Sequence, residues 1–97
     1  MPGEPNSEIT RRRVVYTGRV QGVCFRVTAL ELCQGRPVVG FVRNLPNRTV
    51  ELEAQGTPAE VADFLDAVAS QFAGYITDAA TSTLPLRADE HRFQILY

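Results

Sequence analysis

The sequence predicts an α+β sandwich of the split βαβ type, with two helices covering one face of an antiparallel sheet of four or five strands. Two observations predict this class: the elements follow the order β, α, β, β, α, β, and both helical segments carry one apolar face. A length of 97 residues leaves room for one modest core. We therefore expect one domain over residues 11–97, preceded by a disordered lead at residues 1–10.

The first predicted strand and helix enclose a loop. Residues 14–16 (VVY) are strand-forming and are followed by Thr17 and Gly18, which end the strand. From Phe25 onward apolar side chains recur at helical spacing as far as Cys33, and a glycine two positions later favours a stop. The loop between strand and helix therefore ends where the helix begins.

Four further strands and one turn are expected. Residues 38–43 and the alternating VELEA at 50–54 predict a hairpin around the turn-like LPN at 45–47. AATSTL at 79–84 indicates an irregular or edge strand, and FQILY at 93–97 indicates a final strand.

The second helix has a clear start signal. Thr57 is a suitable N-cap, Pro58 suits the first helical position, and Glu60 completes a capping box. An apolar face follows at helical intervals, formed by Val61, Phe64, Leu65, Val68 and Phe72.

Composition narrows the class of protein. A formal net charge of -1 gives no basic excess for nucleic-acid phosphates, so no nucleic-acid partner is expected. Cys24 and Cys33 fit neither a redox nor a metal-ligand spacing, and they are expected to be free thiols. No secretory segment and no run of about 18 apolar residues occurs. We expect a cytoplasmic protein without membrane contact, with the arginines at 11–13 forming a solvated strand entrance.

The loop TGRVQGVCFR at residues 17–26 is the candidate site. A glycine-containing loop before a helix can turn several N–H groups toward one point, where the helix dipole favours an anion. Arg26 opens the helix and can donate two parallel hydrogen bonds to a phosphoryl group. Taken alone, this pattern also suits a plain tight turn.

GRVQGVCFR at 18–26, GFVRN at 40–44 and TVELEAQG at 49–56 together resemble the acylphosphatase family of small ferredoxin-like enzymes, over residues 12–97. The resemblance implies hydrolysis of acyl phosphates, with no metal and no cofactor. It implies that Asn44 holds the attacking water. It also implies that Arg26 binds the phosphate with the backbone N–H groups of Gln21, Gly22, Val23, Cys24 and Phe25.

Several alternatives accompany this interpretation. The domain could bind an acyl or carbamoyl phosphate for a partner without hydrolysing it, or bind single-stranded RNA, although the VELEA strand lacks the aromatics for that role. Cysteine phosphatases carry a C-x5-R loop, whereas Phe25 alone separates Cys24 from Arg26, so Cys24 is interpreted as a packing residue. His91 is expected to be a solvated surface residue, and the protein a monomer.

Overall fold

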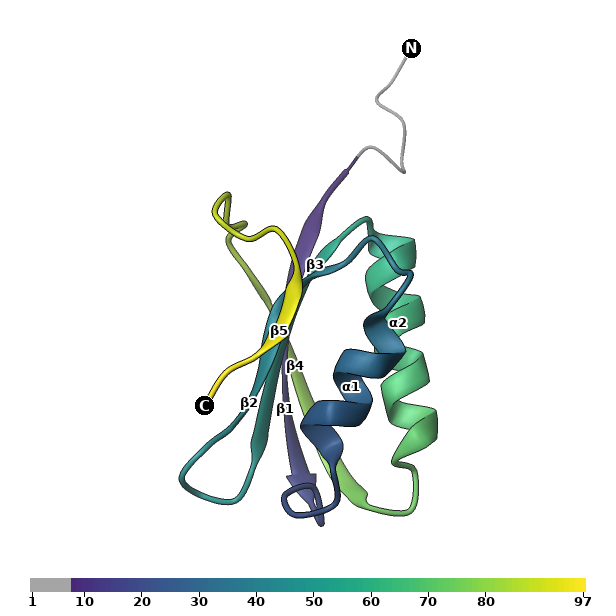
Figure 1. Ribbon diagram of the computed structural model, residues 1–97, viewed down its shortest axis with the longest axis vertical. Helices are drawn as coiled ribbons and strands as arrows, with labels where there is room; N and C mark the ends of the chain where they lie inside the picture. The colour runs from purple at the N-terminus through teal and green to yellow at the C-terminus, as the bar shows by residue number, and fades with distance from the viewer. Residues whose placement is uncertain (1–7) are drawn as a thin grey trace.

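The computed structural model describes residues 8–97, which form five strands and two helices. Both helices lie on one side of the sheet (Figure 1). In chain order the elements are β1 (Thr10–Gly18), α1 (Phe25–Cys33), β2 (Val39–Asn44), β3 (Val50–Gly56), α2 (Pro58–Gln71), β4 (Ile76–Leu84) and β5 (Phe93–Ile95). Residues 1–7 of the expected lead lie outside the described residues, and β1 begins at Thr10. The predicted split βαβ sandwich is confirmed.

The sheet has the strand order β4-β1-β3-β2-β5. Neighbours pair antiparallel except for β2 and β5, which pair parallel. The sheet is therefore mixed, and the expectation of a wholly antiparallel sheet is corrected at this edge. The reason is topological: residues 85–92 carry the chain from β4 to the opposite edge, where β5 meets a strand that already runs in its own direction.

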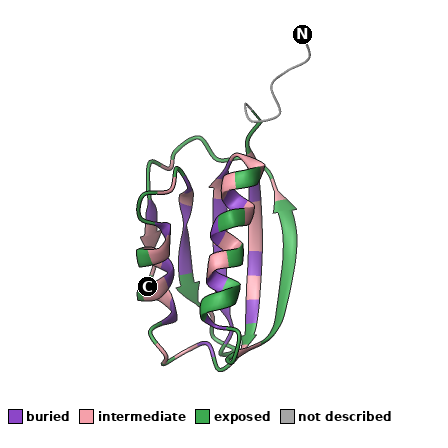
Figure 2. Cartoon of the chain, turned by 90° about the vertical axis from the view of Figure 1, so that its right-hand side faces the viewer, coloured by how far each residue is buried: buried purple, intermediate pink, exposed green. Residues whose placement is uncertain are grey.

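The core lies between the sheet and the helices. Alternate residues of β1 and β3, including Val14, Tyr16 and Leu52, are buried against Phe64 of α2 and its neighbours. Figure 2 shows this buried layer and also shows that β4 is exposed along its length. The predicted edge strand is thus confirmed, and it starts at Ile76 rather than at residue 79.

Local signals set the helix ends. As predicted, α1 begins at Phe25, and Pro58 occupies the first turn of α2. The Thr57 hydroxyl accepts a hydrogen bond of 3.2 Å from the N–H of Glu60, which satisfies one of the free donors at that end. Among residues 8–97, no helix is long and apolar enough to cross a membrane.

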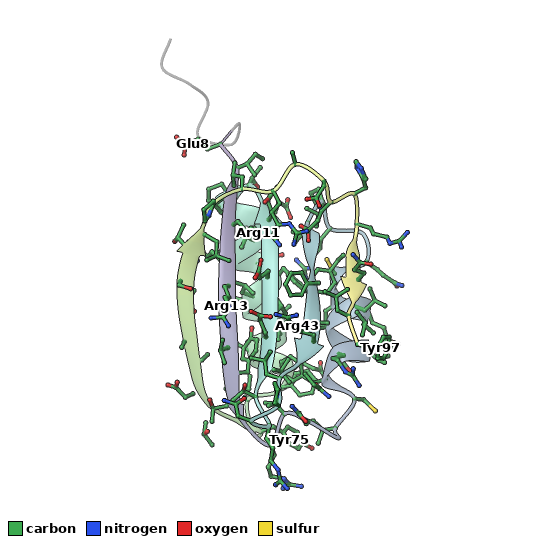
Figure 3. All side chains as sticks on the ribbon, turned by 90° about the vertical axis from the view of Figure 1, so that its left-hand side faces the viewer. Glu8, Arg11, Arg13, Arg43, Tyr75 and Tyr97 are labelled. Atoms are coloured by element: carbon green, nitrogen blue, oxygen red, sulfur yellow. The ribbon has the colours of Figure 1, made fainter. Side chains whose placement is uncertain are left out.

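The other face of the sheet carries a row of charged side chains (Figure 3). The Glu51 carboxylate accepts hydrogen bonds of 2.5 Å from Nε of both Arg13 and Arg43. Arg11 is 1% exposed and donates to Glu53 at 2.8 Å and to Glu90 at 2.6 Å. The expectation of a solvated arginine run is therefore wrong for Arg11, because acidic partners from β3 and the 85–92 loop surround its guanidinium.

Candidate active site

The predicted phosphate loop and the end of β2 lie at the same end of the sandwich (Figure 1). A cavity of about 300 Å³ is lined there by Arg26 of α1 and Asn44 of β2, together with loop residues. The two side chains are eighteen positions apart in the sequence. They reach one cavity because β2 runs back toward the loop and ends at Asn44.

The backbone of the loop offers a group of unpaired donors. Among the described residues, no N–H group from Gln21 to Phe25 has a protein acceptor. Gly22 and Cys24 have φ angles of 78° and 62°, and Val23 between them is not left-handed. Alternation of this kind builds a concave nest of N–H groups that binds anions. The α1 N-terminus adds the positive end of its dipole to the nest.

Phe25 anchors the start of α1 and so orients its neighbour Arg26. The Phe25 ring is 2% exposed and stacks on Phe72 with 4.3 Å between ring centroids. The centroid of the Phe25 ring also lies 5.1 Å from that of the Tyr16 ring. Burial of one phenylalanine contributes about 1.5–3 kcal/mol, enough to fix the first turn of a short helix. Since Phe25 faces the core, the adjacent Arg26 is directed to the cavity.

The guanidinium of Arg26 has no carboxylate partner among the described residues. Its contact is with the ring of Tyr97, whose centroid lies 5.0 Å from Cζ of Arg26. An aromatic face leaves the planar N–H edge of the guanidinium available for a bidentate anion. Tyr97 was not identified from the sequence, because only the fold brings β5 alongside α1.

Asn44 is the last residue of β2, one position beyond the predicted strand at residues 38–43, and its backbone pairs with Val50 of β3. The residue is exposed, and no hydrogen bond joins its carboxamide to another described residue. A carboxamide can accept from water through its oxygen and donate through its nitrogen. Asn44 is therefore free to bind solvent or a ligand in the cavity.

The structure brings together most of the predicted site residues. Five of the predicted residues line the cavity: Gly22, Cys24, Phe25, Arg26 and Asn44. The apolar side chains of Val20 and Val27, which the sequence did not indicate, complete the lining. Gln21 and Val23 instead line an adjacent hollow of about 280 Å³ that shares Gly22 with the first. Arg19 and Arg48 lie on the wall of that hollow.

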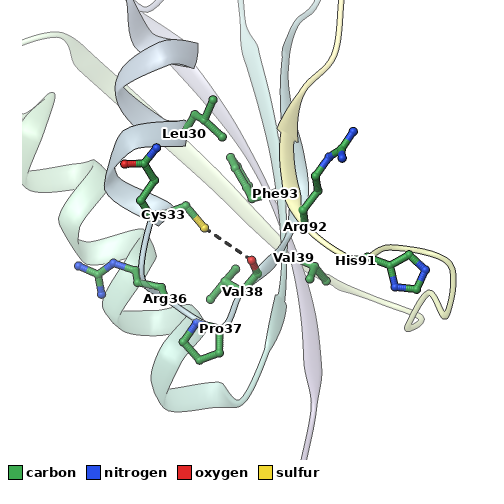
Figure 4. Close-up of a pocket in the computed structure, with 10 residues that line it drawn as sticks. Leu30, Cys33, Arg36, Pro37, Val38, Val39, His91, Arg92 and Phe93 are labelled. Carbon is green, nitrogen blue, oxygen red and sulfur yellow. Dashed lines mark hydrogen bonds between the residues drawn. The ribbon is translucent and has the colours of Figure 1, made fainter.

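A separate cavity of about 310 Å³ opens at the other end of α1 (Figure 4). Its wall includes Cys33, whose thiol donates to the carbonyl of Val38 at 3.6 Å, and the exposed His91, as expected of a surface residue. Burial raises the pKa of the Cys33 thiol to about 11, so this sulfur stays protonated near neutral pH. None of the predicted site residues lies on this cavity.

Within residues 8–97, the loop end of the sandwich combines a nest of main-chain N–H groups, a helix N-terminus and a guanidinium without a carboxylate partner, all of which favour an anion. On a split βαβ sandwich of the ferredoxin-like class, these features are typical of a small domain that binds phosphate groups.

Comparison with known proteins identifies the family within this class. A family model described as Acylphosphatase matches residues 12–95. The chain is 36% identical over 88 residues to an acylphosphatase of Geobacillus thermodenitrificans, covering 90% of this chain and 94% of that protein. It is similar to the crystal structure of acylphosphatase from Bacillus subtilis, with a TM-score of 0.79, 29% identity and coverage of 91% and 99%. The chain belongs to the acylphosphatase family.

A more distant likeness concerns the fold alone. Full-length HypF in its phosphate- and nucleotide-bound form matches with a TM-score of 0.75 at 18% identity, over 93% of this chain and 12% of that one.

The family model and the acylphosphatases of Geobacillus thermodenitrificans and Bacillus subtilis confirm the expected family, the fold class and the assignment as an acylphosphatase hydrolase.

Proposed function

We propose that this protein hydrolyses acyl phosphates to a carboxylate and inorganic phosphate by direct attack of water on the phosphoryl group. One observation carries the proposal: Arg26 and Asn44 line a single cavity with part of the phosphate loop, whose five backbone N–H groups have no acceptor among the described residues.

Arg26 and the N–H groups of residues 21–25 hold the phosphoryl oxygens in this mechanism. Phosphoryl transfer passes through a loose transition state with charge spread over three oxygens, so catalysis depends on positioning and on charge stabilisation. Donors fixed by the backbone need no reorganisation as that charge develops.

Asn44 binds the attacking water and directs it at phosphorus. The bond that breaks joins phosphorus to the acyl oxygen, and the leaving carboxylate takes the electron pair. Its conjugate acid has a pKa of about 4–5, by analogy with side-chain carboxyls, so the reaction needs no general acid. This chemistry accounts for a site built from an arginine, an asparagine and main-chain N–H groups.

The proposal extends to the cellular setting. The substrate is a small acyl phosphate, and the protein acts as a cytoplasmic monomer without metal, cofactor, membrane or nucleic-acid partner. A formal net charge of -1 supports the last point, because nucleic-acid binding depends on excess basic charge. The core supports the monomer, since residues 8–97 already bury an apolar cluster between the sheet and the helices without a partner.

Hydrolysis of benzoyl phosphate in the presence of a chelator tests the proposal. Arg26→Ala should reduce kcat/KM by about 100- to 1000-fold, in line with loss of one oxyanion-type donor. Asn44→Ala should reduce kcat while leaving inhibition by inorganic phosphate nearly intact. Arg92→Ala is the matched control, because it removes an equal charge at the far end of α1, beside the other cavity.

The alternative, an acyl or carbamoyl phosphate-binding module, is distinguished by the same assay. A pure binder would bind inorganic phosphate in a titration and leave benzoyl phosphate intact. Wild-type protein that shows no turnover would overturn the enzymatic proposal.

A further inference from the structure

The side chain of Gln21 joins the phosphate loop to the hairpin that carries Asn44. Its Nε2 donates to the carbonyl of Leu45 at 2.9 Å and to the carbonyl of Thr49 at 2.9 Å. Both partners are carbonyl oxygens, so the nitrogen rather than the oxygen of the amide must face them. The two hydrogens of one amide group thus reach both sides of the β2–β3 turn.

These two carbonyls define the end of the hairpin next to Asn44. Leu45 follows Asn44 directly, and its N–H donates to the Thr49 carbonyl at 2.9 Å. Thr49 is 8% exposed, and its hydroxyl donates to Oδ1 of Asn47 at 2.6 Å. The turn is therefore internally hydrogen-bonded, and Gln21 attaches it as a unit to the loop.

Asn44 has no side-chain hydrogen bond to another described residue, so its place is set by the backbone that bears it. β3 relates the end of β2 to β1, because Val50 pairs with both Asn44 and Tyr16, but the loop leaves the sheet after Gly18. In the described structure, the Gln21 amide makes side-chain hydrogen bonds directly between the loop and the turn.

We propose that Gln21 is a positioning residue that sets the distance and angle between the phosphoryl site and the Asn44-bound water. This inference rests on the proposed function. Gln21 touches neither water nor phosphate through its side chain in this role. It acts through Asn44, and a small misplacement of a reacting group can cost about 100-fold in rate.

Gln21→Met is the direct test, since it retains similar length and volume and removes both donors. We expect kcat for benzoyl phosphate to fall about 10- to 100-fold. The inhibition constant of inorganic phosphate should stay within about twofold of wild type, because the loop N–H groups and Arg26 remain. Gln71→Met is the matched control, an exposed glutamine at the end of α2.

A double-mutant comparison separates positioning from general support of the fold. In an Asn44→Ala background, Gln21→Met should reduce kcat no further, because the group it positions is already absent. Losses that multiply in the double variant would overturn the inference. A Gln21→Met variant with wild-type kcat would overturn it as well, as would equal losses in kcat and phosphate affinity.

Gln21→Glu provides a second variant with a pH signature, should the methionine variant fail to fold. Its carboxylate would face two carbonyl oxygens, which raises its pKa above the ordinary value of a glutamate. Protonation restores one donor, so kcat relative to wild type should rise as the pH falls from about 7 to 5. A flat ratio would overturn the inference. Failure of the wild-type enzyme to turn over would instead overturn the proposed function.

Discussion

Glu51 connects two arginines on the open face of the sheet, and its replacement tests how much that contact stabilises the fold. Its carboxylate is 4% exposed and accepts from Arg13 and Arg43 at 2.5 Å each. In Glu51→Gln, one neutral oxygen remains as an acceptor, and the new NH₂ group faces a guanidinium.

The expected loss in the free energy of unfolding follows from the two charge-assisted hydrogen bonds of Glu51. Each contributes about 1.5–3 kcal/mol when both partners are held away from water, or about 3–6 kcal/mol together. The arginine side chains are 36% and 46% exposed, so they return to solvent at little cost once the carboxylate is gone. We therefore expect Glu51→Gln to lower the free energy of unfolding by about 1.5–3 kcal/mol near neutral pH.

This loss should depend on pH. Burial acts to raise the pKa of Glu51, but the hydrogen bonds and charges of Arg13 and Arg43 outweigh it and hold the pKa below the ordinary value of 4.5. The carboxylate's contribution is thus complete above about pH 4.5 and is lost as the pH falls through the lowered pKa of the folded state. Once Glu51 is protonated it resembles glutamine, and the difference between the two proteins should shrink toward zero.

Urea unfolding followed by circular dichroism, at several values between about pH 7 and pH 3, measures this difference directly. Glu31→Gln is the matched control, an exposed glutamate on α1 without an ion pair among the described residues. A constant difference across the range would refute the reasoning, because it would mean that the charge of Glu51 is irrelevant to the effect.

Three further substitutions test backbone features by thermal or urea unfolding. In Gly40→Ala, the added Cβ would lie 1.9 Å from the carbonyl oxygen of Glu53, so β2 and β3 must separate, with a loss of at least about 3 kcal/mol. Arg48 has a φ of 70°, and Arg48→Gly should stabilise by about 0.5–1 kcal/mol, the relieved strain less the added freedom of the unfolded chain. Thr57→Ala removes the cap on the N–H of Glu60 and should cost about 1 kcal/mol.

Each of these expectations has a clear contrary result. Wild-type stability in Gly40→Ala would mean that the strands accommodate a methyl group. A less stable Arg48→Gly protein would mean that the arginine side chain contributes more than its backbone strain costs. For the cap, Thr57→Ser should keep wild-type stability, and equal losses in the serine and alanine variants would assign the effect to the threonine methyl group.

Local signals made much of the fold predictable. The start of α1 at Phe25 and the Thr57 cap each depend on a few neighbouring residues, and both agree with the structure. The strand predicted at residues 38–43 is β2, which differs from the prediction by one residue at each end. Acylphosphatase-like motifs then indicated that Arg26 and Asn44 belong to one site, and both line the same cavity. Their catalytic roles remain predictions.

Contacts between distant segments could not be predicted. A run of three arginines predicts solvent-exposed side chains. Only the folded structure, in which β1 lies beside β3 and the 85–92 loop, shows that Arg11 is enclosed by Glu53 and Glu90. The parallel pairing of β5 likewise depends on the path of the chain across the sheet. The reach of the Gln21 side chain to Leu45 and Thr49 requires knowing how close the loop and the hairpin turn lie.

The unpaired N–H groups of residues 21–25 have a consequence for how this protein can vary. Every amino acid except proline supplies the same amide hydrogen, so exchanges among side chains in this segment leave its attraction for anions unchanged while the peptide path is kept. Only side chains that make no contact of their own can therefore vary freely in this segment, because Gln21 and Phe25 hold the peptide path through their hydrogen bonds and packing.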